Sequence, residues 1–337
     1  MIVDSLPRLQ KLFVSFVSNP ADFDDLAECW SQAASIHELI YSMNNGWLWL
    51  LKDFLLAPHV QHLPYLSSLS LDNAGNVSVP PPGAHPLLPN LTTLTLGSAG
   101  PSLALYRLTT LLSHCPLLQR VACKSGKYVE EHHQNLQFFQ LRHLSSIETD
   151  QELPLKIFSS YIETPVLRKL TLYKYSGDWI TEFVQKNRGI EDLILNVRTS
   201  PSYDIILTYL TQLRVLSVGG HGHGHFLRPL YTPLPRNSGA PPCAETLQRL
   251  EIVISRDKLH MEYFEKLVHA RFIPVNKEGY TAAGCKAMHE LILIAVEYNQ
   301  VSKQVQESVL WKRAKITKPR SEVFVLHWDF EDTAETS

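Results

Sequence analysis

Three histidines alternate with glycines in the run GGHGHGHF, which starts at Gly219. Alternate side chains of an extended segment point to the same side, so His221, His223 and His225 could present three imidazoles to Zn²⁺ or a similar ion. The glycines leave this backbone unconstrained and a proline-rich stretch follows it, which favours a surface loop. A metal-dependent activity at these histidines is therefore an alternative to a loop without a ligand.

Other motifs of catalysis are missing from the sequence. It contains no phosphate-binding loop and no GxGxxG, HExxH or GxSxG motif. The pairs His37-Glu38 and His289-Glu290 lack the second histidine of a zinc-protease motif and fall in predicted strands. We therefore expect no enzyme and no cofactor.

Composition restricts the class of protein further. The 5 cysteines are dispersed and form no CxxC pair, so neither a disulfide framework nor a zinc knuckle is predicted. A net charge of −2 gives no global field that would gather nucleic acid or an anionic membrane. The start MIVDSLPRLQ does not resemble a secretory signal, and the apolar stretch WLWLLKDFLLA is too short to span a bilayer. We expect a cytoplasmic or nuclear protein.

One short phrase recurs along the chain, for example LPYLSSLSLD, LPNLTTLTLG, TPVLRKLTLY and LTQLRVLSVG. Its pattern, apolar-x-x-apolar-x-apolar, is typical of a short half-buried strand, and most copies follow one another at 23 to 27 residues. This period predicts an α/β solenoid with parallel strands. The eleven copies start at Leu9, Ile36, Leu66, Leu91, Leu118, Leu144, Leu167, Ile190, Leu213, Leu247 and Met288.

Amphipathic segments with helical spacing lie between the copies. They are ALYRLTTLLSHC, DWITEFVQKNRG, SYDIILTYLTQ and MEYFEKLVHARF, and we expect a helix in each. The segment NAGNVSVPPPGAHP is rich in turn formers and is expected to cross between strands as a loop. Cys115 and Cys123 occupy repeat positions that predict packing in the core.

The copies resemble the leucine-rich repeat family, whose signature is LxxLxLxxN/C, over roughly residues 6 to 296. The resemblance implies a curved solenoid with a parallel sheet on its concave side and helices and loops on its convex side. The asparagine of the signature is present only at Asn44, so we expect an irregular solenoid. We predict the solenoid over residues 1–297, and over 298–337 a helix in VSKQVQESVLWKRA, a strand in SEVFVLHW and an acidic tail.

The helical segments, the openings CPLLQ and TPVLRKL, and YFEKLVHARF resemble the repeat region of fungal (basidiomycete-type) F-box proteins. In that family the repeats recruit substrates to a cullin-RING (SCF) ubiquitin ligase, and a separate F-box binds the Skp adaptor. No F-box precedes the first copy here. Because little chain would cover the first repeat, we expect an upstream segment or another chain at that edge, and Skp binding only through an upstream F-box. A free-standing scaffold or inhibitor is the alternative.

The predicted concave side is polar but not basic. Its middle column runs from Phe13 through Ile40, Ser70, Thr95, Ala122, Glu148, Thr171, Ile194, Ser217 and Glu251 to Ile292. Flanking positions place Lys124 beside Asp150, Lys169 beside Asp192, and Arg249 beside Glu290. A protein partner fits this side better than nucleic acid, with Tyr173, Arg120 and Lys169 as the first patch to test. The predicted contact residues are Arg120, Lys124, Glu148, Lys169, Tyr173 and Ile194.

Overall fold

The computed structural model shows two compact units, Met1–Leu167 and Arg168–Ser337. The residues described are 10–16, 35–43, 64–71, 86–97, 103–124, 128–129, 138–173, 179–197, 203–220, 230, 246–254, 261–272, 287–295, 315–317 and 324–329.

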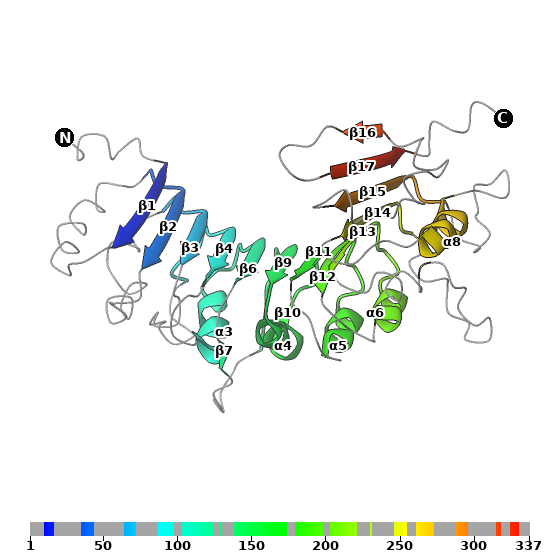
Figure 1. Cartoon of the computed structure of the whole chain (residues 1–337). Coiled ribbons are helices and arrows are strands. Elements are labelled where there is room, and N and C mark those ends of the chain that lie inside the picture. Colours follow the sequence, from blue (N-terminus) through cyan, green and yellow to red (C-terminus); the bar gives the residue numbers. More distant parts are fainter. Residues whose placement is uncertain are drawn as a thin grey trace. The chain divides into compact units, whose positions relative to one another are not determined.

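The first unit contains a sheet in which every described strand runs parallel to its neighbours and follows them in chain order (Figure 1). This order is the one that short right-handed crossovers between successive strands produce. The strands are β1 (Lys11–Phe16), β2 (Glu38–Met43), β3 (Ser68–Leu71), β4 (Thr93–Leu96), β6 (Arg120–Cys123) and β9 (Ser146–Thr149).

The second unit repeats this arrangement and ends differently. Its parallel strands are β11 (Lys169–Leu172), β12 (Asp192–Val197), β13 (Val215–Gly220), β14 (Arg249–Ile254) and β15 (Glu290–Ala295). Strand β17 (Phe324–Asp329) then pairs antiparallel with β15, and β16 (Lys315–Thr317) pairs antiparallel with β17. The last described strands therefore reverse the direction of the sheet.

Each copy of the sequence pattern positions one parallel strand. In all eleven copies the strand begins two residues after the copy does, as β4 begins at Thr93 after Leu91. The register aligns the central apolar positions, so that Leu69 pairs with Leu94 and Leu193 with Leu216. The predicted α/β leucine-rich repeat solenoid is confirmed.

The core of each unit is made by the three apolar positions of every copy. In the copy that forms β4, Leu91, Leu94 and Leu96 are at most 1% exposed. Burying a leucine contributes roughly 1.5–3 kcal/mol, so each rung is stabilised mainly by these side chains. Thr149 fills one apolar position of its copy, and its hydroxyl is satisfied locally by Gln151 through bonds of 3.0 Å.

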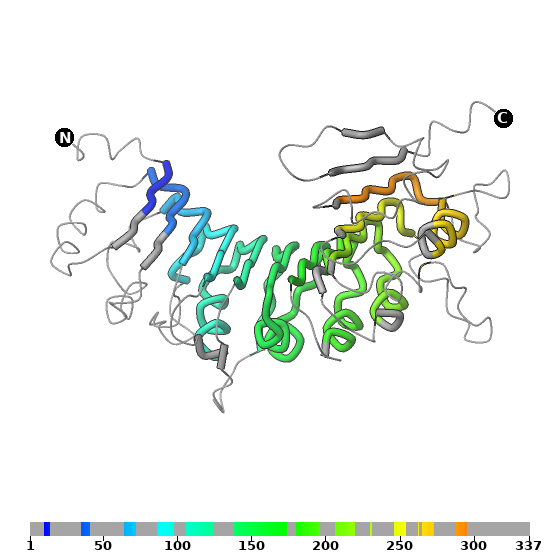
Figure 2. The backbone as a smooth tube through the Cα atoms, in the orientation of Figure 1, coloured from blue at the N-terminus to red at the C-terminus, as the bar shows by residue number. Residues whose placement is uncertain are grey.

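Helices cover one face of the sheet in each unit (Figure 1). Figure 2 traces the chain of the second unit from strand to helix and back to the next strand. The four predicted helices are confirmed as α3 (Leu105–Ser113), α5 (Trp179–Lys186), α6 (Tyr203–Tyr209) and α8 (Met261–Arg271).

A fifth helix, α4 (Glu152–Ser160), is not among those expected from the sequence. Its Pro154 lies in the first turn, where a backbone N–H has no partner within the helix, so the ring is tolerated. The residue before the helix, Gln151, makes no side-chain capping bond. Proline and the missing capping residue are the reasons why the sequence pattern did not indicate this helix.

Two pairs of very short strands lie outside the main sheet. Leu103–Ala104 (β5) pairs parallel with Tyr128–Val129 (β7), and Phe139–Gln140 (β8) pairs parallel with Ile162–Glu163 (β10). Strands of two residues carry no periodic signal, and the sequence did not predict them.

A ladder of backbone carbonyls joins successive copies just before their strands. The Thr92 carbonyl, for example, accepts hydrogen bonds from the N–H groups of Gln119 at 2.8 Å and Arg120 at 2.9 Å. We call this repeated arrangement the carbonyl ladder. Its accepting carbonyls belong to Gln10, His37, Ser67, Thr92 and Gln119 in the first unit and to Arg168, Glu191, Arg214 and Gln248 in the second.

The strand predicted in SEVFVLHW is β17, whereas the helix predicted in VSKQVQESVLWKRA lies outside the described residues. The boundary between residues 1–297 and 298–337 stays a prediction.

Candidate functional site

The face of each sheet opposite the helices is formed by side chains that alternate with the core positions. We call it the open face. Its middle column is aligned by the strand register as predicted, from Phe13 to Glu148 in the first unit and from Thr171 to Ile292 in the second. Side chains from successive copies therefore lie side by side on this face.

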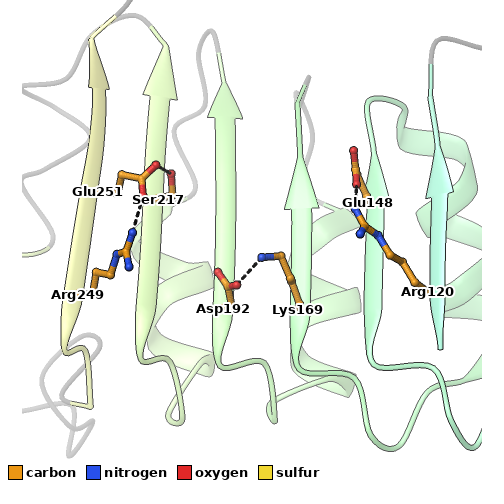
Figure 3. Close-up of polar contacts among 7 residues, drawn as sticks. All are labelled: Arg120, Glu148, Lys169, Asp192, Ser217, Arg249 and Glu251. Atoms are coloured by element: carbon orange, nitrogen blue, oxygen red, sulfur yellow. Dashed lines mark hydrogen bonds and ion pairs between the residues drawn. The ribbon is translucent and has the colours of Figure 1, made fainter. Parts of the chain in front are cut away.

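A three-residue charge cluster lies on the open face of the first unit. The Glu148 carboxylate is 2.9 Å from Arg120 Nη2 and 3.0 Å from Lys124 Nζ. The Glu148 side chain is 8% exposed, whereas those of Arg120 and Lys124 are 55% and 50% exposed. Figure 3 shows Arg120 reaching from β6 to Glu148 on β9. Two long cations thus cover one nearly buried carboxylate and leave part of their own surface open.

The strand register explains this cluster. Glu148 is paired with Ala122, a small residue between Arg120 on β6 and Lys124, which directly follows β6. Side chains two residues apart on a strand point to the same face, so both cations can bend over alanine toward the carboxylate. We expected Lys124 to pair with Asp150, its direct neighbour, but the ion pair in the structure is the diagonal one with Glu148. A lysine side chain is long enough to make either contact.

Hydroxyl groups occupy the centre of the open face in the first unit. Ser68 pairs with Thr93 and Ser70 with Thr95 across β3 and β4. All four side chains are partly exposed, and none forms a hydrogen bond within the part of the chain that the structure describes. They offer donors and acceptors to an incoming molecule without carrying charge.

Opposite charges on the open face of the second unit pair with each other. Lys169 Nζ is 2.7 Å from Asp192 Oδ2. Arg249 Nη2 lies 3.3 Å from Glu251 Oε2, and Arg249 Nε lies 3.4 Å from Glu290 Oε2. The predicted pairs Lys169–Asp192 and Arg249–Glu290 are confirmed.

Ser217 adds a neutral hydrogen bond to this group of charges. Its hydroxyl donates to Glu251 at 3.2 Å (Figure 3). The carboxylates of Asp192, Glu251 and Glu290 are thus balanced by two cations and one hydroxyl, which belong to Lys169, Arg249 and Ser217.

Apolar surface lies next to the Lys169–Asp192 pair. Tyr173 directly follows β11 and is 40% exposed. Ile194 is half-buried and pairs in register with Thr171, two residues before Tyr173. Aromatic and branched side chains at such positions are typical anchors of protein interfaces. Arg120 belongs to the other unit, so the predicted patch of Arg120 with Lys169 and Tyr173 stays a prediction.

The described cysteines are core residues, as predicted. Cys115 and Cys123 are both 0% exposed. Burial raises the pKa of the Cys115 thiol from its ordinary value of 9.0 to about 12, and its Sγ lies 3.4 Å from the Leu111 carbonyl oxygen. A thiol with such a pKa stays protonated near neutral pH and is a poor nucleophile.

The proposed metal-binding run, His221, His223 and His225, lies outside the described residues. Within the described ranges no group of three or more His, Cys, Asp or Glu side chains could hold a metal ion. His37 precedes β2, where its Nδ1 is 2.7 Å from the Ser35 carbonyl and its ring stacks on Tyr65 at 5.8 Å. The helices that the structure describes include none long and apolar enough to cross a membrane.

Sequence reasoning missed a second polar row, one residue before each strand. In the second unit it contains Arg168, Glu191 and Arg214, which come from successive copies. The signal was available, because these residues occupy the same position in the repeat. These residues precede the strands, so the alternation of side chains within the strands did not indicate them.

This arrangement of strands is similar to that of solved structures, but not to a known protein family by sequence. No protein-family model matches the chain, and no curated protein matches it significantly. Solved structures are similar to it at low sequence identity. One is the TLR13–ssRNA13 complex, with 16% identity and a TM-score of 0.36 over 76% of this chain and 38% of the TLR13 chain.

A second similar structure is a leucine-rich repeat protein of Leptospira interrogans. It is 15% identical, with a TM-score of 0.35 over 86% of this chain and 81% of the bacterial one. The likeness concerns the fold alone. The function must therefore be argued from the residues of this chain.

Proposed function

We propose that this chain is a protein-binding module without catalytic activity, and that it takes up its partner on the open face. The observation that carries the proposal is the exposed Tyr173, which directly follows β11, together with half-buried Ile194 and the Lys169–Asp192 pair on β11 and β12. Exposed aromatic groups bordered by paired charges provide the apolar centre and polar rim of a protein interface.

The charges on the open face support a protein partner over nucleic acid. In the first unit Lys11 pairs with Glu38 at 2.9 Å, and Arg120 and Lys124 share Glu148. In the second unit Lys169 and Arg249 meet Asp192, Glu251 and Glu290. Nucleic acid is bound through unbalanced positive charge, which these pairs reduce. We therefore propose neither a nucleic-acid ligand nor a membrane surface for this face.

The finer proposal is that the module recognises substrates of an F-box type ubiquitin ligase. Its support is the resemblance of the helical segments and repeat openings to fungal F-box proteins. Binding of the Skp adaptor belongs to this proposal only if an F-box precedes the repeats. A scaffold or inhibitor without a role in ubiquitin transfer would use the same open face and is the competing proposal.

The binding proposal is tested by affinity capture from extracts of the source cells with matched variants. We expect Tyr173→Ala combined with Ile194→Ala to lose the captured partner, because both side chains lie on the open face. Leu117→Ala is the control, since Leu117 is also exposed (41%) but lies in the turn before β6. Equal capture by all three proteins would contradict the proposal.

The ligase proposal needs a separate measurement. If the captured partner is a ligase substrate, its half-life should lengthen when the gene for this protein is deleted, and its ubiquitin conjugates should decrease. An unchanged half-life, with capture still lost in the open-face variant, would leave the scaffold or inhibitor proposal. Failure of the ligase proposal is in this way distinguished from failure of binding.

A further inference from the structure

Three exposed arginines lie in the turns that lead into the strands of the second unit. Arg168 directly precedes β11, Arg188 lies between α5 and β12, and Arg214 directly precedes β13. The side chains of Arg168 and Arg214 are 67% and 61% exposed. They are separate from the columns of the open face, because they lie before the strands begin.

A single glutamate links two of these arginines. Glu191 Oε1 accepts a hydrogen bond from Arg168 Nη1 at 2.7 Å, and Glu191 Oε2 lies 3.9 Å from Arg214 Nε. The third arginine, Arg188, donates from Nε to the Gln185 carbonyl at 3.2 Å and lies 5.9 Å from the centre of the Tyr209 ring. Two arginines therefore share one carboxylate, and Arg188 adds a third positive charge three residues before Glu191 in the chain. These four side chains together carry a net charge of +2.

Most hydrogen-bond donors of these guanidinium groups are unused by described residues. A guanidinium carries five N–H donors arranged to bind a carboxylate or phosphate with two bonds at once. Arg168 uses one donor at hydrogen-bond distance, Arg188 uses one, and the 3.9 Å contact of Arg214 is an ion pair without a hydrogen bond. The arrangement can therefore accept further anionic groups.

The backbone fixes the positions from which two of the arginines extend. The carbonyls of Arg168, Glu191 and Arg214 all accept bonds in the carbonyl ladder. Neighbouring strands are about 4.8 Å apart, so Arg168 and Arg214 start about 10 Å apart. An extended peptide advances about 3.3 Å per residue, so acidic residues about three positions apart span that distance. The spacing suits successive carboxylates of an extended segment.

We propose that Arg168, Arg188 and Arg214 form a docking surface for an acidic segment of a protein partner, which they bind through its carboxylates. Glu191 already shows that this surface holds a carboxylate between two arginines. A net charge of +2 on so small a surface is far below the extended basic track that binds nucleic acid without sequence preference. This surface is additional to the open face and does not depend on the function proposed for that face.

The first test measures binding of a fluorescein-labelled polyglutamate peptide by fluorescence anisotropy at low ionic strength. The variant Arg168→Gln/Arg188→Gln/Arg214→Gln should bind about tenfold more weakly, as expected for the loss of three exposed ion pairs. The matched control Arg142→Gln/Lys156→Gln/Lys266→Gln removes the same charge from exposed positions elsewhere. It should bind within about twofold of the unchanged protein, because only the three arginines form the surface.

A second variant tests the proposal in the opposite direction. Glu191→Gln removes the internal carboxylate that competes for Arg168 and Arg214, so the peptide should bind about threefold more tightly. This result does not depend on whether the triple variant folds, which circular dichroism checks.

Three outcomes would overturn the proposal. The triple variant could bind like the unchanged protein, or the control could weaken as much as the triple variant. An oligouridylate of equal charge could also bind more tightly than polyglutamate, which would point to nucleic acid instead of an acidic protein segment.

Discussion

At the scale of single residues, two buried groups lead us to expect that the stability of the protein depends on alkaline pH and on one ion-paired carboxylate. Cys115 is a buried thiol inside the core, and Glu148 is a nearly buried carboxylate on the open face. The first is neutral because burial disfavours its charged form, and the second is charged beside two cations.

Cys115 should make stability fall at alkaline pH. Its pKa in the folded protein is about 12 and its ordinary value is 9.0, so its contribution is complete below pH 9.0 and is lost as the pH rises toward 12. Denaturant unfolding of the natural protein and of Cys115→Ala at pH 8 and pH 10 measures this effect. The stability advantage of the natural protein should shrink by about 1.4 kcal/mol at pH 10. An advantage of equal size at both pH values would contradict the prediction.

Glu148 should matter more than an exposed glutamate with a similar partner. Glu148→Gln removes ion pairs with Arg120 and Lys124 and should lower the free energy of unfolding by about 1 kcal/mol. Glu38→Gln is the control, because Glu38 and Lys11 form a single pair in which both side chains are exposed (38% and 59%). Its effect should stay below about 0.5 kcal/mol in the same urea titration. Equal losses of unfolding free energy in the two variants would contradict a larger stabilisation by the nearly buried Glu148.

The sequence indicated individual pairs only where direct neighbours were involved. Lys169–Asp192 and Arg249–Glu290 follow from the strand register alone, and both were expected. The diagonal contact of Lys124 with Glu148 depends on the small side chain of Ala122 and on the choice of rotamer. Such choices are not visible in a pattern of apolar spacing. The site is therefore less predictable than the strands that carry it.

At the scale of elements, the leucine positions determine where strands begin. The phrase apolar-x-x-apolar-x-apolar located the eleven described parallel strands of the main sheet, because its apolar positions are the ones that each strand buries in the core. Helix α4 was missed because Pro154 and the absence of a capping side chain hide its local signal. The two-residue strands β5, β7, β8 and β10 were missed because they are too short to carry a periodic pattern. Local propensity is a weak guide where tertiary contacts decide.

Two neighbouring residues of β12 should differ sharply on replacement. Leu193 is 0% exposed in the core, whereas Ile194 lies half-buried on the open face. Leu193→Ala should lower the free energy of unfolding by about 3 kcal/mol, because it leaves a cavity. Ile194→Ala should cost less than about 1 kcal/mol and act mainly on partner binding. Thermal and urea unfolding separate the two, and similar losses would mean that the faces of β12 are assigned incorrectly.

At the scale of the whole molecule, each described repeat is stabilised by the strands next to it. Parallel pairing links β2 to β3 and β3 to β4, and the carbonyl ladder follows the same order. The stability of such a chain is a sum of repeat and nearest-neighbour terms. A substitution in the core of one repeat should therefore destabilise that repeat and its immediate neighbours, but not distant repeats.

Hydrogen exchange can measure this distance. Leu69→Ala in β3 should speed amide exchange about tenfold or more in β2, β3 and β4, because it weakens one core rung. Exchange in β13, which belongs to the second unit and comes six strands after β3 in the sheet order, should change far less. Leu216→Ala in β13 is the reciprocal control. If amide exchange became faster to the same extent throughout the chain, the protein would instead unfold as one cooperative unit.

The carbonyl ladder has a consequence for how such a gene can change over generations. Its acceptors are main-chain oxygens, so nearly any residue can occupy those positions without breaking a bond between rungs. The stretches between strands already differ in length, from 23 to 41 residues between copy starts. Duplication or loss of one complete copy would therefore rejoin the same ladder and lengthen or shorten the polar surface by one strand. Descendant genes can in this way acquire a new row of contact residues while the remaining rungs keep their hydrogen bonds.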